Sequence, residues 1–243
     1  MTTKIWLVIN GLLLSAIVLC GVMFWLYGRR MADLQKTVES KDAELGRSSY
    51  FIGAFPENMP WINKFLVKTR YSLQIWSDHC AYGNFSNPEQ YAEYSSTIKQ
   101  LKQKNVTITI HIYESKTADA MTKSQFNLTK AGDSAEFRAL VKSNRFKKYF
   151  EYNNQHKTPK TVPKTVEEFV SLMNNDEEAC ISELSEQGIS IEQDVSSPLP
   201  LFTWVQDDDE AIFSMYNLGP DAREVSLYTK DKQLVNLLKS IRH

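Results

Sequence analysis

Residues 106–113, VTITIHIY, form the stretch that decides the fold class. The stretch is rich in β-branched residues, which is typical of a β-strand. Strand-like runs precede it at 50–55 and 71–77, and amphipathic segments at 58–70 and 88–104 separate the three runs. Because strands that alternate with helices usually form a parallel sheet covered by helices, this order predicts an α/β domain.

The second half of the domain continues with helices and then strands. Segments 134–150 and 166–187 have helical patterns, and the linker KTPKTVPKT between them carries two prolines that interrupt a helix. Strand candidates follow at 189–193, 201–205, 211–216 and 224–229, and a closing helix is expected at 231–241. The whole pattern predicts one α/β domain with a mixed, mainly parallel sheet.

The N-terminal segment 5–27, IWLVINGLLLSAIVLCGVMFWLY, contains no charged residue. About 20 apolar helical residues cross a bilayer, and aromatic residues at the two ends suit the headgroup boundary. The segment is longer than the apolar part of a signal peptide, and it ends in bulky residues instead of a small-residue cleavage site. It therefore predicts one retained transmembrane helix, with the lipid bilayer as a partner.

The charges around this helix predict its orientation. Arg29, Arg30 and Lys36 follow the apolar run, whereas only Lys4 and the α-amino group precede it. Because positive charges collect on the cytoplasmic side, a single-pass protein of the cell membrane with a cytoplasmic domain is expected. The expected organisation is an anchor at 1–30, a helical stalk or linker at 31–49 and the α/β domain at 50–243.

Composition narrows the classes of partner and cofactor. The chain of 243 residues has a formal net charge of −1, which gives no global reason to expect nucleic acid as a partner. The four histidines are scattered, and no Cys-x-x-Cys pair, Gly-rich phosphate loop or Gly-x-Ser-x-Gly elbow occurs. No metal site and no cofactor are therefore expected. Cys80 and Cys180 are expected to be buried thiols, with a disulfide in an oxidising compartment as the alternative.

Two regions contain residues that could take part in catalysis or ligand binding. DHCAYGNFSNPEQY, residues 78–91, follows a strand end, where α/β sheets usually bind ligands. Asp78 and His79 could form an acid/base pair there, although such a pair is more often a polar loop end with a capping role. The second region, 206–231, combines an acidic hairpin turn with two strands.

This second region resembles the C-terminal part of a phospholipase D-like half-domain. Ser214 and Asn217 match the family's Ser-x-x-Asn-like segment, Glu224 matches the acid that follows, and KDKQLVNLLKSI matches the closing helix. Asp208 takes the place of the aspartate in the family's His-x-Lys-x4-Asp motif. The resemblance implies an α/β/α sandwich and a ligand-binding role for Ser214, Asn217, Glu224 and Asp208, although a buried Asn and Glu could also serve pocket structure alone.

The chain departs from the family at the catalytic residues. In active members the His attacks phosphorus and the Lys holds the phosphate oxygens. Alignment on Asp208 places Leu201 and Thr203 at these positions, and neither adjacent register restores the pair. None of the other histidines begins the motif. We therefore expect a binding or scaffolding pseudoenzyme for a phosphorylated ligand or a protein partner.

Two alternatives remain open at the level of sequence. The first is a phosphodiesterase with relocated catalytic groups, in which Asp78 or His79 acts together with Glu224. It requires His79 and Glu224 to meet across one cleft. The second is a structural membrane assembly protein that oligomerises through its helix and stalk, and a homodimer would also suit the family's arrangement of two half-domains.

Overall fold

The computed structural model describes most residues of one domain and leaves a few gaps along the chain. The described residues are 29, 48–114, 117, 119, 120, 122, 123, 126, 128, 132–195, 201–216 and 224–240. Ser49–His243 is one compact unit. The predicted transmembrane segment and Asn217 lie outside the described residues. Within the described part, no helix is both long and apolar enough to cross a membrane.

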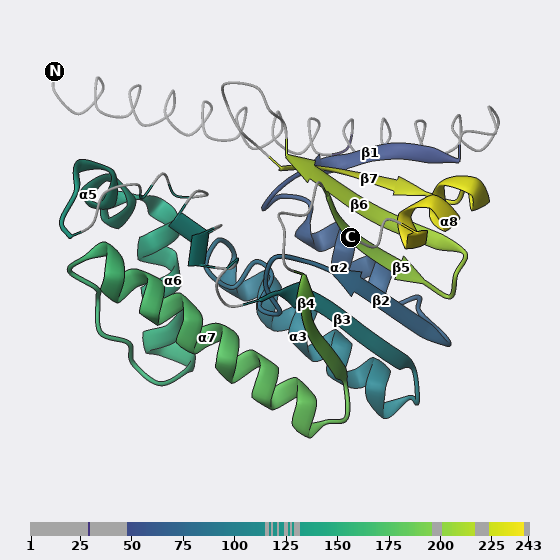
Figure 1. Cartoon of the computed structure of the whole chain (residues 1–243), viewed down its shortest axis with the longest axis horizontal. Coiled ribbons are helices and arrows are strands. Elements are labelled where there is room, and N and C mark those ends of the chain that lie inside the picture. The colour runs from purple at the N-terminus through teal and green to yellow at the C-terminus, as the bar shows by residue number, and fades with distance from the viewer. Residues whose placement is uncertain are drawn as a thin grey trace, which may run out of the picture. The chain divides into compact units, whose positions relative to one another are not determined.

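The domain has an α/β architecture built on a seven-stranded mixed sheet (Figure 1). Its strands are β1 (Ser49–Ala54), β2 (Ser72–Trp76), β3 (Thr107–Tyr113), β4 (Ser190–Val195), β5 (Leu201–Gln206), β6 (Glu210–Tyr216) and β7 (Glu224–Thr229). Its helices are α2 (Met59–Leu66), α3 (Pro88–Gln103), α5 (Ala135–Lys142), α6 (Asn144–His156), α7 (Val166–Glu186) and α8 (Lys232–Ser240). The strands and helices expected within the domain are present with ends shifted by a few residues, except that the helix expected over 134–150 is replaced by two helices.

The expectation of a mainly parallel sheet is wrong. The strand order is β1-β7-β6-β5-β2-β3-β4, and only the pairs β2–β3 and β3–β4 are parallel. The other four pairs are antiparallel. β1 precedes a helix as a parallel strand would, but it pairs with β7 at the far edge of the sheet. The alternation of strands and helices indicates that a sheet is covered by helices, but it does not determine which strands become neighbours.

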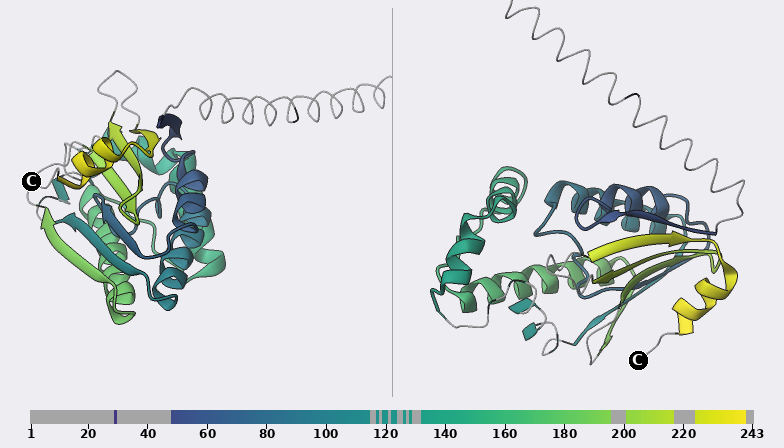
Figure 2. Two further views of the ribbon diagram at one scale, coloured as in Figure 1. Left: turned by 90° about the vertical axis from the view of Figure 1, so that its right-hand side faces the viewer. Right: turned by 90° about the horizontal axis from the view of Figure 1, so that it is seen from above.

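Three apolar clusters hold the helices in place. In the largest, side chains of α2, α3 and α7 pack against one face of the sheet. α8 packs on the opposite face against β5 and β6, around Val235 and Leu238 (Figure 2). The third cluster joins α5, α6 and the first half of α7 around Phe169, which is fully buried. The helices therefore cover both faces, and a separate helical group adds a wall beyond the strand ends.

The expected continuous helix over 134–150 is divided in two by Ser143. This residue adopts an extended conformation with ψ 152°, so that α5 ends and α6 begins on either side of it. Its hydroxyl oxygen accepts a hydrogen bond from the backbone N–H of Phe146 at 3.2 Å, as an N-capping serine does. The break places Arg145 in the first turn of α6, where its side chain lines a pocket.

Candidate functional site

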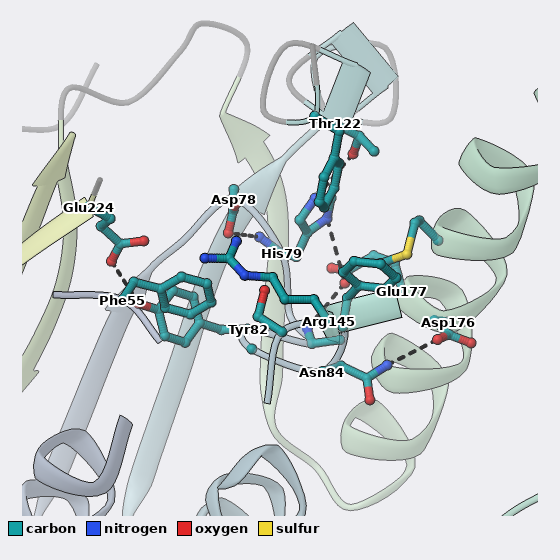
Figure 3. Close-up of a pocket in the computed structure, with 16 residues that line it drawn as sticks. Phe55, Asp78, His79, Tyr82, Asn84, Thr122, Arg145, Asp176, Glu177 and Glu224 are labelled. Atoms are coloured by element: carbon teal, nitrogen blue, oxygen red, sulfur yellow. Dashed lines mark hydrogen bonds and ion pairs between the residues drawn. The ribbon is translucent and has the colours of Figure 1, made fainter. Parts of the chain in front are cut away.

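A pocket of about 270 Å³ opens beyond the end of β2 (Figure 3). One wall is the loop from Asp78 to Ser86, and α7 supplies another through Met173, Asp176 and Glu177. Phe55 and Glu224 close the side next to β1 and β7. Segments from the whole length of the domain therefore meet at this point.

Glu224, the first residue of β7, is the most perturbed acid in the pocket. Glu224 is 6% exposed, and its Oε1 accepts a hydrogen bond from the Tyr82 hydroxyl at 2.6 Å. Burial first, and the charge of Asp78 next, raise the pKa of Glu224 to about 7, against hydrogen bonds from Tyr82 and Ser214 that lower it. The protonated form of this carboxyl group is therefore populated at a much higher pH than in an exposed glutamate.

Asp78 lies just beyond β2, separated from it by Ser77, and is also buried. Its Oδ1 accepts hydrogen bonds from the Ser77 hydroxyl at 3.1 Å and from the backbone N–H of His79 at 2.9 Å. Both bonds are local, so they fix the carboxylate at the strand end. Because its charge acts on Glu224, the pocket holds two buried carboxyl groups that interact electrostatically.

Glu177 on α7 fixes the loop that follows β2. Its two carboxylate oxygens accept hydrogen bonds from the backbone N–H groups of Cys80 at 2.5 Å and Ala81 at 3.1 Å. Burial raises the pKa of Glu177, while His79 and these two N–H groups lower it. The His79 ring lies with Nδ1 3.8 Å from Glu177 and Nε2 3.4 Å from the Thr122 hydroxyl.

The remaining charged groups stand at the outer part of the pocket. Asp176 forms an ion pair with Lys160 and accepts a hydrogen bond from the Asn84 amide at 3.0 Å. Arg145 is exposed and its side chain extends over the pocket from α6. Asp176 is therefore compensated within the protein by Lys160.

The charge of the lining suits a cation better than an anion. The lining contains four carboxyl groups, one arginine and one histidine, and no lysine among its described residues. A phosphate group needs a surplus of donors and positive charge, as supplied by the His and Lys of an active phospholipase D-like site. The pocket thus disfavours the phosphorylated ligand that the family resemblance suggested.

The structure separates the predicted site residues into different places. Asp78, His79 and Glu224 all line the pocket. Within the described residues, however, the His79 ring contacts Thr122 and Glu177 and makes no hydrogen bond or ion pair with Glu224. The geometry that the relocated phosphodiesterase requires is therefore met only in part.

Ser214 and Asp208 have roles that differ from each other. Ser214 is fully buried beneath Glu224, and its hydroxyl lies 2.5 Å from that of Ser226. Asp208 lies in the β5–β6 turn, at the end of β6 opposite to that paired with Glu224, and forms an ion pair with Lys239 at 2.7 Å. Asp208 thus does not contribute to the pocket, and Ser214 supports it from below.

Three functional residues escaped the sequence reasoning. Tyr82 donates a hydrogen bond to Glu224, and Glu177 accepts one from the backbone of the loop after β2. The side chain of Arg145 lines the pocket from α6. Glu177 stands in an acidic run on a helix, and Arg145 in a basic one, so neither differs in sequence from a solvated helical face. Only Tyr82 had a local signal, because it belongs to the turn-rich stretch 78–91.

No protein-family model and no curated protein matches the chain. Among the solved structures similar to the chain are two that match it at low TM-scores. One is TrmBL2, an archaeal chromatin protein with a novel mode of DNA binding, at 12% identity and TM-score 0.38, with 90% of this chain and 63% of that chain covered. The other is the phosphatidylserine synthase of Haemophilus influenzae Rd KW20, at 13% identity and TM-score 0.38, with coverages of 79% and 36%. The chain thus spans less than two thirds of either protein.

The expected partners need correction. Nucleic acid was not expected on the ground of net charge, whereas one of the similar structures is that of a DNA-binding chromatin protein. Net charge is a sum over the whole chain and does not describe local patches, so it is no ground for excluding nucleic acid as a partner. Neither finding supports a lipid bilayer or a second copy of the chain as a partner. The membrane localisation and the cytoplasmic orientation of the domain stay predictions, because they rest on segment 5–27.

Proposed function

We propose that this chain carries a phospholipase D-like binding domain that has no phosphodiesterase activity and binds a small cationic ligand. The observation that carries the proposal is the pair of buried carboxyl groups, Asp78 and Glu224, in a pocket whose described lining has no lysine. Their mutual repulsion raises the pKa of Glu224, together with burial. A cation between them would favour the charged form of both.

The walls of the pocket support a ligand with an ammonium group. Phe55 and Tyr82 line it with ring centroids 5.1 Å apart, and such aromatic faces attract cations. Ammonium groups also donate the hydrogen bonds that carboxylate oxygens accept. Because the pKa of Glu224 is raised to about 7, binding of a cation near neutral pH should release part of a proton.

The test uses titration calorimetry of the full chain with putrescine, ethanolamine and choline, and with inorganic phosphate for comparison. We expect at least one amine to bind, and Asp78→Asn to weaken that binding by roughly tenfold through loss of one partly desolvated ion pair. Asp208→Asn, an equally conservative change outside the pocket, should leave binding unchanged. Measurements in two buffers with different ionisation enthalpies should reveal proton release. Binding of phosphate with no amine bound would contradict the proposal.

A phosphodiesterase with relocated groups is the second candidate, and one specific observation favours it. Glu224 has a pKa of about 7, which suits general acid–base catalysis near neutral pH, and Asp78 and His79 line the same pocket. Turnover of bis(p-nitrophenyl) phosphate by the wild type would support this candidate if both His79→Ala and Glu224→Gln abolished it. We expect no turnover, since the described lining has no lysine, and its one arginine, Arg145, stands against four carboxyl groups that repel a phosphate.

A further inference from the structure

Arg145 is the one arginine in the described lining of the pocket, and the residues that follow it on α6 fix its place there (Figure 3). Phe146 is 3% exposed and packs against Phe85 of the pocket loop, with ring centroids 6.2 Å apart. Tyr149, one turn further along α6, contacts the same Phe85 ring with centroids 5.2 Å apart. The first turn of α6 is therefore held beside the pocket loop, and the Arg145 side chain lines the pocket as a result.

The Arg145 guanidinium has no acceptor within the described part of the protein. It forms no ion pair or hydrogen bond with a described residue, although four carboxyl groups line the same pocket. Arg138, the other arginine of this helical group, instead pairs with Asp133 at 3.0 Å. Arginine carries five N–H donors in a planar fork that matches the oxygens of an anionic group, so Arg145 offers a place for an anion at the outer part of the pocket.

The four carboxyl groups of the lining do not all have the same role. Asp176 forms an ion pair with Lys160, and Glu177 accepts hydrogen bonds from two backbone N–H groups of the pocket loop. The other two, Asp78 and Glu224, form the proposed site for an ammonium group. The pocket thus combines a pair of acids from the ends of two strands with one positive group from α6. Charges of both signs in one pocket suit a ligand that also carries both.

The balance of charges favours a carboxylate over a phosphate as the anionic group of the ligand. A carboxylate carries one negative charge, which one arginine can neutralise through two parallel hydrogen bonds. A phosphate monoester carries close to two negative charges at neutral pH. Its second charge would face the carboxyl groups of the lining, where no lysine among the described residues balances it. The pocket volume of about 270 Å³ limits the ligand to a small molecule.

We propose that the pocket binds a small zwitterion of the amino-acid class, with its ammonium group at Asp78 and Glu224 and its carboxylate on Arg145. This inference rests on the proposed cation site and adds a second charged group of the ligand to it. Arg145 then determines specificity, because a simple amine gains no contact from the guanidinium and is repelled by its charge. Amines and amino acids should therefore respond differently when the charge of Arg145 is removed.

The test compares pairs of ligands that differ only in the anionic group, by titration calorimetry of the full chain. Glycine is paired with ethylamine, β-alanine with propylamine and 4-aminobutyrate with butylamine, so that a methyl group replaces each carboxylate. We expect at least one amino acid to bind about three- to tenfold more tightly than its matched amine. The pair with the largest ratio reports the separation of the two charge sites. The ratio should fall at high salt, because the Arg145 side chain is exposed.

Variants at two exposed positions of α6 test whether Arg145 is the source of this preference. Arg145→Gln should remove the preference for the amino acid and leave the affinity for the amines unchanged or slightly higher. Lys147→Gln removes an exposed charge outside the pocket lining and should keep the ratio of the wild type. The inference is overturned, with the cation site intact, if amines bind and no amino acid binds more tightly, or if Arg145→Gln keeps the preference. If neither amines nor amino acids bind, the proposed function itself fails, and this inference fails with it.

Discussion

At the scale of single residues, the Glu224 carboxyl group makes stability depend on pH. Burial first, and the charge of Asp78 next, raise its pKa from 4.5 to about 7 in the folded protein. The folded state therefore holds this proton more tightly than the unfolded chain does. Its contribution to stability is fully present below pH 4.5 and is lost as the pH rises through about 7.

The Glu224→Gln variant tests this linkage. At one pKa unit per 1.36 kcal/mol, the wild type should lose about 3 kcal/mol of unfolding free energy through this group between pH 4.5 and pH 8. The variant cannot ionise, so its stability should fall less over this range and should exceed that of the wild type at pH 8. Urea unfolding followed by circular dichroism at several pH values measures both. Parallel pH profiles of stability for the two proteins would show that folding does not shift the pKa of the Glu224 carboxyl group.

At the scale of elements, the β5–β6 turn connects two parts of the sheet through Asp207. Its carboxylate accepts hydrogen bonds from three successive backbone N–H groups, those of Arg70, Tyr71 and Ser72, at 3.0, 2.7 and 3.0 Å. These groups precede and begin β2, which is the antiparallel neighbour of β5. One turn residue thereby fixes the start of the central strand that leads to Asp78.

Asp207→Ala and Asp208→Ala form a matched pair. Both residues have positive φ, 53° and 58°, so alanine meets a similar backbone cost at either position. Only Asp207→Ala also leaves three N–H groups without their acceptor, so it should cost about 1.5–3 kcal/mol more in unfolding free energy than Asp208→Ala. Denaturant unfolding of the two variants measures the difference. Equal stabilities would mean that water replaces the carboxylate without loss.

At the scale of the whole molecule, two cysteines distant in sequence meet in the core. The Sγ atoms of Cys80 and Cys180 lie 3.1 Å apart, and both residues are buried free thiols. One stands in the pocket loop and the other on α7, so the contact depends on the complete tertiary arrangement. The hydrogen bond with Cys180 and burial raise the pKa of the Cys80 thiol, which suppresses the reactive thiolate.

We therefore expect both thiols to react with iodoacetamide only when the domain opens. Under reducing native conditions, peptide mapping by mass spectrometry should find neither cysteine alkylated within minutes, whereas unfolded protein should be alkylated at both. The two labelling rates should also rise together in denaturant, because one core protects both. Rapid labelling of Cys80 alone would mean that the pocket loop opens separately from α7.

The predicted elements illustrate what local sequence determines. The alternating and β-branched run at 106–113 became β3, and the apolar stripe at 231–241 became α8, because burial of one face requires a regular spacing of apolar residues. The absence of a His-x-Lys-x4-Asp motif was visible for the same reason, since a motif is a local pattern. Ser143 was the exception, because a capping serine inside an amphipathic run resembles an ordinary helical residue until neighbouring helices pack against it.

Tertiary structure alone decided which strands became neighbours and which side chains share the pocket. The sequence placed Asp208 with Glu224 through a motif, yet a whole strand separates them, while Tyr82 and Asp78 reach Glu224 from more than a hundred residues away. Strand order, direction and the position of Arg145 beside the pocket loop depend on contacts between distant segments. The spacing of apolar residues along a segment determines which face of the segment is buried. Which other segment covers that face depends on the packing free energy of the whole domain.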